Sequence, residues 1–284
     1  MSDEIDRLIA AEGLPSDYRE IVDENWRPLA TRIARAAASR TPLIVGISAA
    51  QGTGKTTLCK VLEILLAQRG LNAVTLSLDD LYLPRAQREQ LAREVHPLFA
   101  TRGVPGTHAV ADGIAIIEDV LAGRPFDLPR FDKASDDRLP QPDRIDSPVD
   151  VLLFEGWCVG ALPQEQSAIT DPVNALEEQE DADGTWRNLS NHWLSGEYQR
   201  LFDLIDILVM LKIRDFNAVC VNRAKQEEKL VASDPNGSAT MDDAALARFL
   251  MHYERLTRHM LMDLPARADV LYTVDDRQRP TLVR

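Results

Sequence analysis

The chain has 284 residues, of which 45% are hydrophobic and 27% are charged, a composition typical of folded globular proteins. Its formal net charge of −13 disfavours binding to nucleic acid or to an anionic membrane and favours small-molecule partners. The cysteines are widely spaced and form no C-x-x-C pair, so they predict neither a disulfide framework nor a zinc site. Because the N-terminus is acidic and no apolar run reaches membrane-spanning length, the sequence predicts a cytoplasmic protein.

The first part of the chain has a helical pattern. Pro28 suits the first turn of a helix, and Leu29 and Ile33 recur at helical spacing behind it. An apolar stripe of this kind usually packs on a core, and a docking surface for a partner is the alternative. We expect residues 1–40 to form an N-terminal helical arm on a domain that spans residues 41–284.

A glycine-containing turn within residues 43–58 (LIVGISAAQGTGKTTL) joins an apolar, strand-like run to an amphipathic helix. In this order, backbone N–H groups and a helix N-terminus form an anion site, Lys55 reaches the outer phosphates and the Thr56 hydroxyl coordinates Mg²⁺. The strict motif has glycine where this chain has Ala49, which is tolerable if φ there stays negative. The alternative is a chance turn at a helix N-cap. The predicted triphosphate site consists of Ala49, Ala50, Gln51, Gly52, Thr53, Gly54, Lys55, Thr56 and Thr57.

Further apolar runs along the chain are typical of buried β-strands. Helical or long connections separate them, and the first such helix ends at Gly70. This alternation predicts an α/β protein with the P-loop NTPase fold, a doubly wound and mainly parallel sheet flanked by helices. After the strand that precedes the glycine turn, the predicted strands lie at residues 72–78, 149–155, 205–213 and 269–274.

Acidic side chains lie at the C-terminal ends of two of these predicted strands. Asp79 and Asp80 follow the second predicted strand, and Glu155 ends the third. The carboxyl ends of parallel strands share one edge with the phosphate-binding turn. Asp79 is our candidate for the base that accepts the proton of an acceptor hydroxyl, and Asp80 is the alternative. Glu155 is the candidate Mg²⁺ ligand, a role compatible with an ion pair to Lys55.

Two insertions separate the strands. Residues 96–144 contain loops rich in Pro, Gly and paired charges, at 96–110 and 124–144, which are candidates for the acceptor pocket. Residues 161–195 carry an acidic run at 177–183 (EEQEDAD), which we expect to be a solvated surface face.

Residues 214–230, after the fourth strand, are a candidate lid. A lid that lays Arg223 over the transferring phosphoryl group would exclude water and neutralise developing charge. The alternative is a solvated basic helix in which Arg223 pairs with Glu227 four residues later.

Motifs spread over about residues 40–284 together resemble the D-glycerate 3-kinase family, which is related to the uridine kinase, pantothenate kinase and phosphoribulokinase group. They read GISAAQGTGKTTL, SLDDLYL, RGVPGTHAV, PRFDKASDDR, VLLFEGW and FLMHYERLTR. The resemblance implies that Asp79 is the catalytic base and that Arg223 is the lid arginine. Together with Lys55, these two residues are the predicted catalytic residues. It implies a substrate site at Asp80, Tyr82, Arg102, His108, Asp132, Lys133 and Arg138, where Arg102, Lys133 and Arg138 are the candidates for a carboxylate.

The sequence therefore predicts an ATP- and Mg²⁺-dependent kinase whose acceptor is a small-molecule hydroxy acid. The resemblance implies D-glycerate, phosphorylated on its 3-hydroxyl. Two alternatives are open: a kinase for another small alcohol, pantothenate-like or nucleoside-like, and a regulatory ATPase that phosphorylates no acceptor. A GTP-dependent switch is disfavoured because the guanine-specificity motif is missing after the fourth strand. The sequence does not indicate an oligomeric state.

Overall fold

The structure is a computed structural model, which describes residues 3–233 and 241–284. Its core is a sheet with the strand order β10-β9-β8-β1-β7-β2, in which β10 runs antiparallel to β9 and the other neighbours pair in parallel. Each predicted apolar run overlaps one strand of this sheet, and only β10 was not predicted, so the expectation of a mainly parallel sheet is confirmed. The strands are β1 (Leu43–Ala49), β2 (Ala73–Ser77), β7 (Val151–Gly156), β8 (Ile207–Lys212), β9 (Val270–Val274) and β10 (Pro280–Leu282).

Alternate residues of the central strands enter two hydrophobic cores on opposite faces of the sheet. In β1, Val45 and Ile47 belong to one core and Ile44 to the other, and in β7 Leu153 and Phe154 divide in the same way. Both strands are buried over their whole length. A strand that is covered on both faces needs a continuous apolar run, which explains why these segments show no polar alternation.

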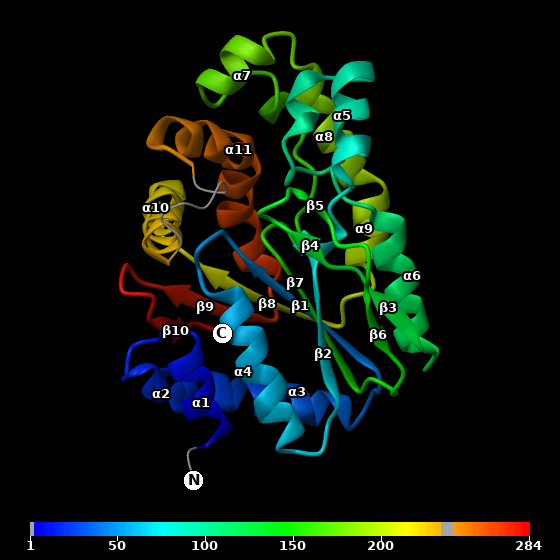
Figure 1. The fold of residues 1–284 in the computed structure, drawn as a ribbon, viewed down its shortest axis with the longest axis vertical. Coiled ribbons are helices and arrows are strands. Elements are labelled where there is room, and N and C mark those ends of the chain that lie inside the picture. Colours follow the sequence, from blue (N-terminus) through cyan, green and yellow to red (C-terminus); the bar gives the residue numbers. More distant parts are fainter. Residues whose placement is uncertain (1–2, 234–240) are drawn as a thin grey trace.

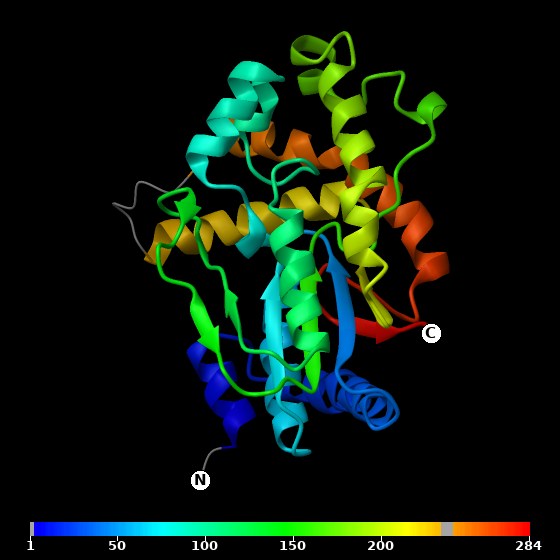
Figure 2. The same cartoon turned by 90° about the vertical axis from the view of Figure 1, so that its right-hand side faces the viewer.

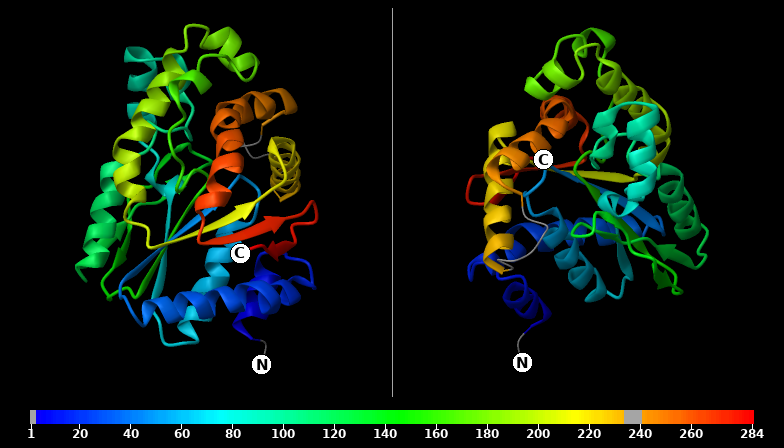
Figure 3. Two further views of the ribbon diagram at one scale, coloured as in Figure 1. Left: turned by 180° about the vertical axis from the view of Figure 1, so that it is seen from behind. Right: turned by 45° about the horizontal axis from the view of Figure 1, so that its top comes forward.

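Helices cover both faces of the sheet, as Figures 1 and 3 show. α4 packs on the first face with the N-terminal helices, and α6 and α9 cover the second. α10 and α11 lie side by side beyond the end of β8 (Figure 1). No helix in the described ranges combines the length and the apolar character needed to cross a membrane. The bounds are α4 (Lys55–Ala67), α6 (Val110–Leu121), α9 (Glu197–Phe202), α10 (Phe216–Ser233) and α11 (Asp243–Arg267).

The N-terminal segment has helical stretches between residues 4 and 37 with a non-helical connection at residues 12–17, and residues 1–2 lie outside the described part. The ring of Trp26 meets that of Tyr272 in β9 edge-on, with 5.1 Å between centroids. The Tyr272 hydroxyl donates to the carbonyl of Asn25 at 3.1 Å. These contacts join the segment to the last strands of the sheet. Its helices are α1 (Glu4–Ala11), α2 (Tyr18–Ile21) and α3 (Arg27–Ala37), with a π-helical turn at Val22–Trp26.

Between β2 and β7 the chain leaves the sheet and builds small antiparallel ribbons beside it, which Figure 2 shows at its left side. β3 pairs with β6, and β4 pairs with β5. These ribbons occupy the stretch that the sequence assigned to acceptor loops. The elements are 3₁₀ turns at Leu78–Leu81 and Pro97–Ala100, α5 (Arg85–Glu94), β3 (Phe126–Leu128), β4 (Phe131–Asp132), β5 (Asp137–Arg138) and β6 (Asp143–Ile145).

The acidic run at 177–183 corrects one expectation. Glu177 and Asp181 are only 0% and 1% exposed, so this run is not simply a solvated face. Arg255 pairs with Glu177 at 2.6 Å, and Arg187 pairs with Asp181 at 2.9 Å. Glu177 lies in the helix at Ala175–Glu180 and Asp181 is the C-cap that follows it. Both acids face inward, whereas the other acids of the run, Glu178, Glu180 and Asp183, face water. The surrounding elements are a 3₁₀ turn at Gln166–Ala168, α7 (Ala175–Glu180) and α8 (Thr185–Ser195).

Candidate active site

The phosphate-binding turn has the backbone that its sequence requires. α4 begins at Lys55, and its N-cap Gly54 is left-handed, with φ 88°. Gly52 has φ 74°, and a Cβ on it would lie 2.8 Å from the Cβ of Asn222 in α10. Both positions therefore need glycine. Ala49 pairs with Leu211 of β8 as a regular strand residue without positive φ, so the departure from the strict motif is tolerated as expected.

Polar atoms around this turn lack partners within the described residues. The side-chain oxygens of Gln51 and Thr53 are buried and accept or donate no hydrogen bond. An unpartnered buried polar group is costly, so such atoms commonly mark the place of a ligand or water. Together with the free N–H groups at the start of α4, they form a site suited to a polyanion.

Glu155 lies at the end of β7, facing the first turn of α4. It is 2% exposed, and its Oε1 accepts hydrogen bonds from the Ser77 hydroxyl at 2.9 Å and the Thr56 hydroxyl at 3.3 Å. Its Oε2 is buried and has no partner among the described residues, so the alternative of an ion pair with Lys55 is not found there. Burial raises the pKa of Glu155, although the nearby charge of Lys55 opposes this.

An unpartnered carboxylate oxygen beside a hydroxyl fits a divalent cation. Thr56 and Glu155 supply two hard oxygen ligands of the kind that Mg²⁺ prefers. No group of three or more His, Cys, Asp or Glu side chains that could hold a metal occurs in the described residues. A magnesium ion here would therefore take its remaining ligands from phosphate and water, as is usual for this ion.

Asp79 and Asp80 have different surroundings, although they are adjacent in the chain. The Asp79 carboxylate accepts from the Lys133 ammonium and from the Tyr82 hydroxyl, both at 2.6 Å. Burial by itself would raise the pKa of Asp79, but the charges of Lys133 and Lys55 outweigh it and leave that pKa below its ordinary value. This makes Asp79 an ionised acid on the edge that also carries the phosphate-binding turn.

Asp80 points to a different part of the structure. It accepts from the Arg130 guanidinium at 2.9 Å and from the backbone N–H of Phe131 at 3.0 Å. Burial raises the pKa of Asp80, with these hydrogen bonds opposing the shift. These contacts tie the segment after β2 to the start of β4. The structure therefore gives Asp80 an anchoring position and leaves Asp79 beside the phosphate-binding turn.

His108 is buried behind the ring of Tyr82. The two ring centroids are 4.8 Å apart, and the His108 Nδ1 lies 2.6 Å from the Tyr198 hydroxyl. Burial lowers the pKa of His108 to about 3, so the imidazole is neutral at physiological pH. Its Nε2 is buried without a partner in the described part of the chain. A neutral imidazole with one open nitrogen can form a hydrogen bond to a substrate hydroxyl.

Three other residues that the resemblance assigned to the substrate already have protein partners. Arg102 pairs with Asp136. Arg138 donates to the carbonyls of Leu81 and Tyr82 and also pairs with Asp112. Asp132 accepts from residues 134 and 135 within its own turn. The hydrogen bonds of Arg138 and Asp132 hold the loop conformation. Arg102, Lys133 and Arg138 are the candidates to bind a substrate carboxylate, and among them Lys133 contacts Asp79.

Arg223 lies in α10, the helix that contains most of the predicted lid. It pairs with Glu227 at 2.7 Å, and its side chain is 16% exposed. This pair is the one that the alternative of a charged helix specified. The side chains of residues 229 and 230, at the end of the predicted lid, lie outside the described part of the chain.

Sequence reasoning missed three side chains that support the site. Ser77 donates to Glu155, and Tyr198 contacts His108, as described above. The Tyr253 hydroxyl donates to the carbonyl of Arg102 at 2.8 Å, which ties α11 to the acceptor loop. Ser77 and Tyr253 lie in motifs that carried the family resemblance, so position within a motif was an available signal. Tyr198 lies in no such motif, and only the packing of α9 on the loop reveals it.

Comparisons with known proteins place this chain in a family. No family model matches the chain. It is 30% identical over 228 residues to "Uncharacterized kinase mug58" of Schizosaccharomyces pombe, across 75% of this chain and 78% of that protein. It is 28% identical over 264 residues to the chloroplastic D-glycerate 3-kinase of Arabidopsis thaliana, across 85% of this chain but only 54% of that protein.

A solved structure shares the fold over nearly the whole chain. The D-glycerate 3-kinase of Cryptococcus neoformans superposes with a TM-score of 0.74 and 22% identity, across 92% of this chain and 99% of that one. At this identity the likeness establishes the fold, and the sequence relatives establish the family. The chain belongs to the D-glycerate 3-kinase family of P-loop kinases, phosphotransferases with an alcohol group as acceptor.

Proposed function

We propose that this protein transfers the γ-phosphoryl group of ATP to the 3-hydroxyl of D-glycerate, forming 3-phosphoglycerate and ADP. The observation that carries the proposal is the contact of 2.6 Å between the Lys133 ammonium and the Asp79 carboxylate, on the edge of the phosphate-binding turn. A hydroxy acid presents a hydroxyl and a carboxylate on one small molecule. An acid that accepts a proton and a cation that binds a carboxylate are the complementary pair.

The phosphate-binding turn would hold the nucleotide. Its glycines and the N-terminus of α4 surround the phosphates with N–H groups, and Lys55 binds the outer phosphate oxygens. Thr56 and Glu155 would hold Mg²⁺, which when bound neutralises charge on the transferring group. Positioning and charge neutralisation make up most of the catalysis in phosphoryl transfer.

Asp79 would accept the proton of the 3-hydroxyl as the oxygen attacks the phosphorus. Its contact with Lys133 has a chemical consequence for that step. An acceptor carboxylate that bound Lys133 would share the ammonium with Asp79 and so raise the pKa of Asp79. The base would become stronger when its substrate is present.

Arg223 would stabilise the transferring group from the side of α10. Arginine has several N–H donors in a rigid fork, so Arg223 keeps donors for a phosphate while it pairs with Glu227. The neutral imidazole of His108 would bind a hydroxyl of the acceptor through its open Nε2. These assignments support a small polar acceptor.

The cation beside the base favours a hydroxy acid over a nucleoside-like acceptor, because a nucleoside has no carboxylate to bind Lys133. An acceptor panel tests this directly. ADP release is measured with MgATP and D-glycerate, L-glycerate, pantothenate or uridine, and NMR identifies the phosphorylated hydroxyl. We expect turnover of about 1–100 s⁻¹ with D-glycerate. Acceptor-independent hydrolysis, or preference for pantothenate or uridine, would contradict the proposal.

A further inference from the structure

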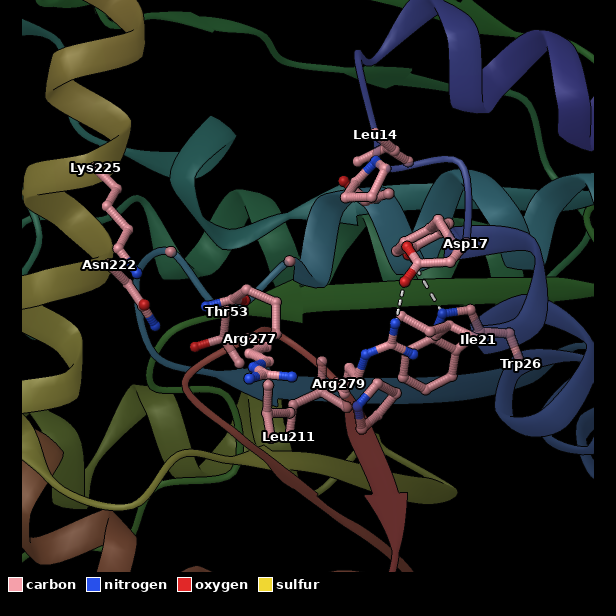
Figure 4. A pocket seen from close by; sticks show the side chains of 18 of the residues that line it. Leu14, Asp17, Ile21, Trp26, Thr53, Leu211, Asn222, Lys225, Arg277 and Arg279 are labelled. Atoms are coloured by element: carbon pink, nitrogen blue, oxygen red, sulfur yellow. Dashed lines mark hydrogen bonds and ion pairs between the residues drawn. The ribbon is translucent and has the colours of Figure 1, made fainter.

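The two sides of the phosphate-binding turn have different surroundings. A cavity of about 520 Å³ lies between the turn, α10 and the N-terminal segment, as Figure 4 shows, and Thr53 and Thr57 are among the residues that line it. Asp79, Lys133 and Arg102 do not line this cavity. The place where an acceptor carboxylate would meet these cations therefore lies outside it.

The backbone of Arg102 is anchored by side chains from two distant segments. Tyr253 of α11 is 2% exposed, and its hydroxyl donates to the Arg102 carbonyl at 2.8 Å. The indole Nε1 of Trp157, which follows β7, donates to the carbonyl of Gly103 at 2.9 Å. The rings of Trp157 and Tyr253 meet edge-on, with 4.9 Å between centroids. Because a buried carbonyl that loses its partner is costly, these two bonds fix the backbone at Arg102.

The guanidinium of Arg102 is held by the β4–β5 hairpin, which carries Lys133. Its Nη1 pairs with the Asp136 carboxylate, and its Cζ lies 5.6 Å from the centre of the Phe131 ring. Phe131 precedes Lys133 and Asp136 follows it, so Arg102 contacts both arms of this hairpin. Asp79 raises the pKa of Lys133, and the charge of Arg102 opposes that shift, as expected for two neighbouring cations.

Asp136 is itself held by Arg88 of α5. Arg88 is 1% exposed, and its Nη2 lies 2.9 Å from the Oδ2 of Asp136. Its Nε and Nη1 donate to the carbonyls of Leu83 and Ala100 at 3.1 and 2.8 Å. The backbone of Asp136 has φ 56°, a value that is uncommon outside glycine and persists only where the surroundings fix it. Asp136 is thus a rigid partner for Arg102.

The two arginines that share Asp136 differ in the donors that they leave open. Every nitrogen of the Arg88 guanidinium has a partner. In the described part of the chain, Nη1 of Arg102 donates to Asp136, whereas its Nε and Nη2 donate no hydrogen bond. The Arg102 side chain is 17% exposed. Because Nε–H and an Nη2–H lie parallel on one edge of the planar group, this edge can bind a carboxylate through two hydrogen bonds.

We propose that Tyr253 and Asp136 are positioning residues, which hold Arg102 at its carbonyl and at its guanidinium so that the open edge binds the acceptor carboxylate together with Lys133. The inference rests on the proposed function. A cation that is already fixed loses little conformational entropy when its ligand binds, so the two anchors raise the affinity for the acceptor. α11 thereby contributes to acceptor binding through Arg102.

Tyr253→Phe tests the backbone anchor, because it removes the hydroxyl and keeps the ring. ADP release should show KM for D-glycerate raised about fivefold or more, with kcat within about threefold and KM for MgATP within about twofold of wild type. Tyr272→Phe is the matched control. The Tyr272 hydroxyl, also buried, donates to the carbonyl of Asn25 at 3.1 Å. Its loss should lower the unfolding temperature as Tyr253→Phe does, and leave KM for D-glycerate within about twofold of wild type.

A double-mutant cycle tests whether Tyr253 acts through Arg102. Arg102→Gln should raise KM for D-glycerate about tenfold, since a charge-assisted contact is lost. Adding Tyr253→Phe to Arg102→Gln should then change this KM by less than about twofold, because the side chain that Tyr253 positions is absent.

Asp136→Gly tests the second anchor. Glycine accepts the positive φ, so the carboxylate is removed without backbone strain. Loss of a negative charge by itself would strengthen anion binding, whereas release of the Arg102 guanidinium weakens it. We expect the release to be the larger effect, because solvent screens the field of a carboxyl group that is 33% exposed. KM for D-glycerate should therefore rise about threefold or more.

The inference is overturned if Tyr253→Phe leaves KM for D-glycerate unchanged, if Tyr272→Phe raises it equally, or if Tyr253→Phe has its full effect in the Arg102→Gln protein. A lower KM in Asp136→Gly would also overturn it. Each of these results leaves the proposed function standing when the wild-type protein phosphorylates D-glycerate. If the acceptor is pantothenate, the proposed acceptor is refuted, and the same comparisons with pantothenate, which also has a carboxylate, decide the inference. Uridine as the acceptor would overturn both.

Discussion

The ammonium of Lys133 lies 2.6 Å from a carboxylate oxygen of Asp79, although the two residues come from separate elements. Asp79 follows β2, and Lys133 lies in the turn between β4 and β5. The Lys133 side chain is 62% exposed and that of Asp79 is 20% exposed, so an anion from solvent can reach the ammonium. The pair therefore connects the binding of an anionic acceptor with the basicity of Asp79.

Replacing Lys133 with methionine should change the pH dependence of turnover. The charge of Lys133 helps to hold the pKa of Asp79 below 3.8, so removing that charge raises the pKa. The acid limb of kcat/KM, where Asp79 becomes protonated, should move to higher pH. KM for D-glycerate should rise about 10–100-fold, since a charge-assisted hydrogen bond is lost. Lys133→Arg keeps the charge and should keep the acid limb near that of wild type. An unchanged limb in Lys133→Met would refute the role given to this pair.

Asp79→Asn should bind ATP like the wild-type protein and lose transfer. The amide has nearly the same shape but cannot accept the hydroxyl proton, so kcat should fall about 10²–10⁴-fold. Asp80→Asn is the matched variant. Because Asp80 anchors Arg130 and Phe131, we expect it to lower the free energy of unfolding by about 1–3 kcal/mol and to change kcat less than tenfold. The reverse pattern would make Asp80 the base.

Lys55→Ala should weaken MgATP binding about 10–100-fold, because the ammonium forms charge-assisted hydrogen bonds to phosphate oxygens. Calorimetric titration with MgATP measures the change. Lys60→Ala removes the same charge from an exposed position on the same helix, where Lys60 pairs with Glu12, and should leave ATP affinity near that of wild type. Equal losses in the two variants would point to a general effect of charge.

Arg223→Gln should lower kcat about 10³-fold with little change in ATP affinity, if its guanidinium stabilises charge that develops during transfer. Single-turnover kinetics with bound ATP separates this effect from nucleotide binding. Arg214→Gln is the control, because Arg214 is 62% exposed and pairs with Asp276 at the surface. A kcat near that of wild type in Arg223→Gln would leave the arginine with the helix-stabilising role that its pair with Glu227 suggests.

Glu177→Gln should destabilise the fold without acting at the active site. Glu177 is 0% exposed and pairs with Arg255, so the substitution leaves a buried guanidinium without its counter-charge. The free energy of unfolding should fall by about 3–5 kcal/mol, as measured by urea denaturation. Glu178→Gln, on the exposed side of the same helix, should change it by less than about 0.5 kcal/mol. Equal effects in both variants would contradict the burial argument.

The amino-acid sequence by itself determined the parallel strands of the sheet and the phosphate-binding turn. Continuous apolar runs mark strands that are buried on both faces, and a glycine turn before a helix has few other structural solutions. Because parallel strands end on a common edge, the sequence predicted that Asp79 and Glu155 lie on the edge that also carries Lys55. These features depend on local pattern, which a single sequence records.

Tertiary structure decided which charges are paired and which are available. The sequence did not distinguish Lys133, which contacts Asp79, from Arg138, whose donors hold backbone carbonyls. The sequence also predicted that Glu177 is exposed to solvent. In the structure Glu177 is buried and pairs with Arg255 of α11. Such pairings join residues far apart in the chain, so they depend on how the loops pack on the sheet. For the same reason the sequence did not predict the cavity beside Thr57, because its walls include residues from the first and last parts of the chain.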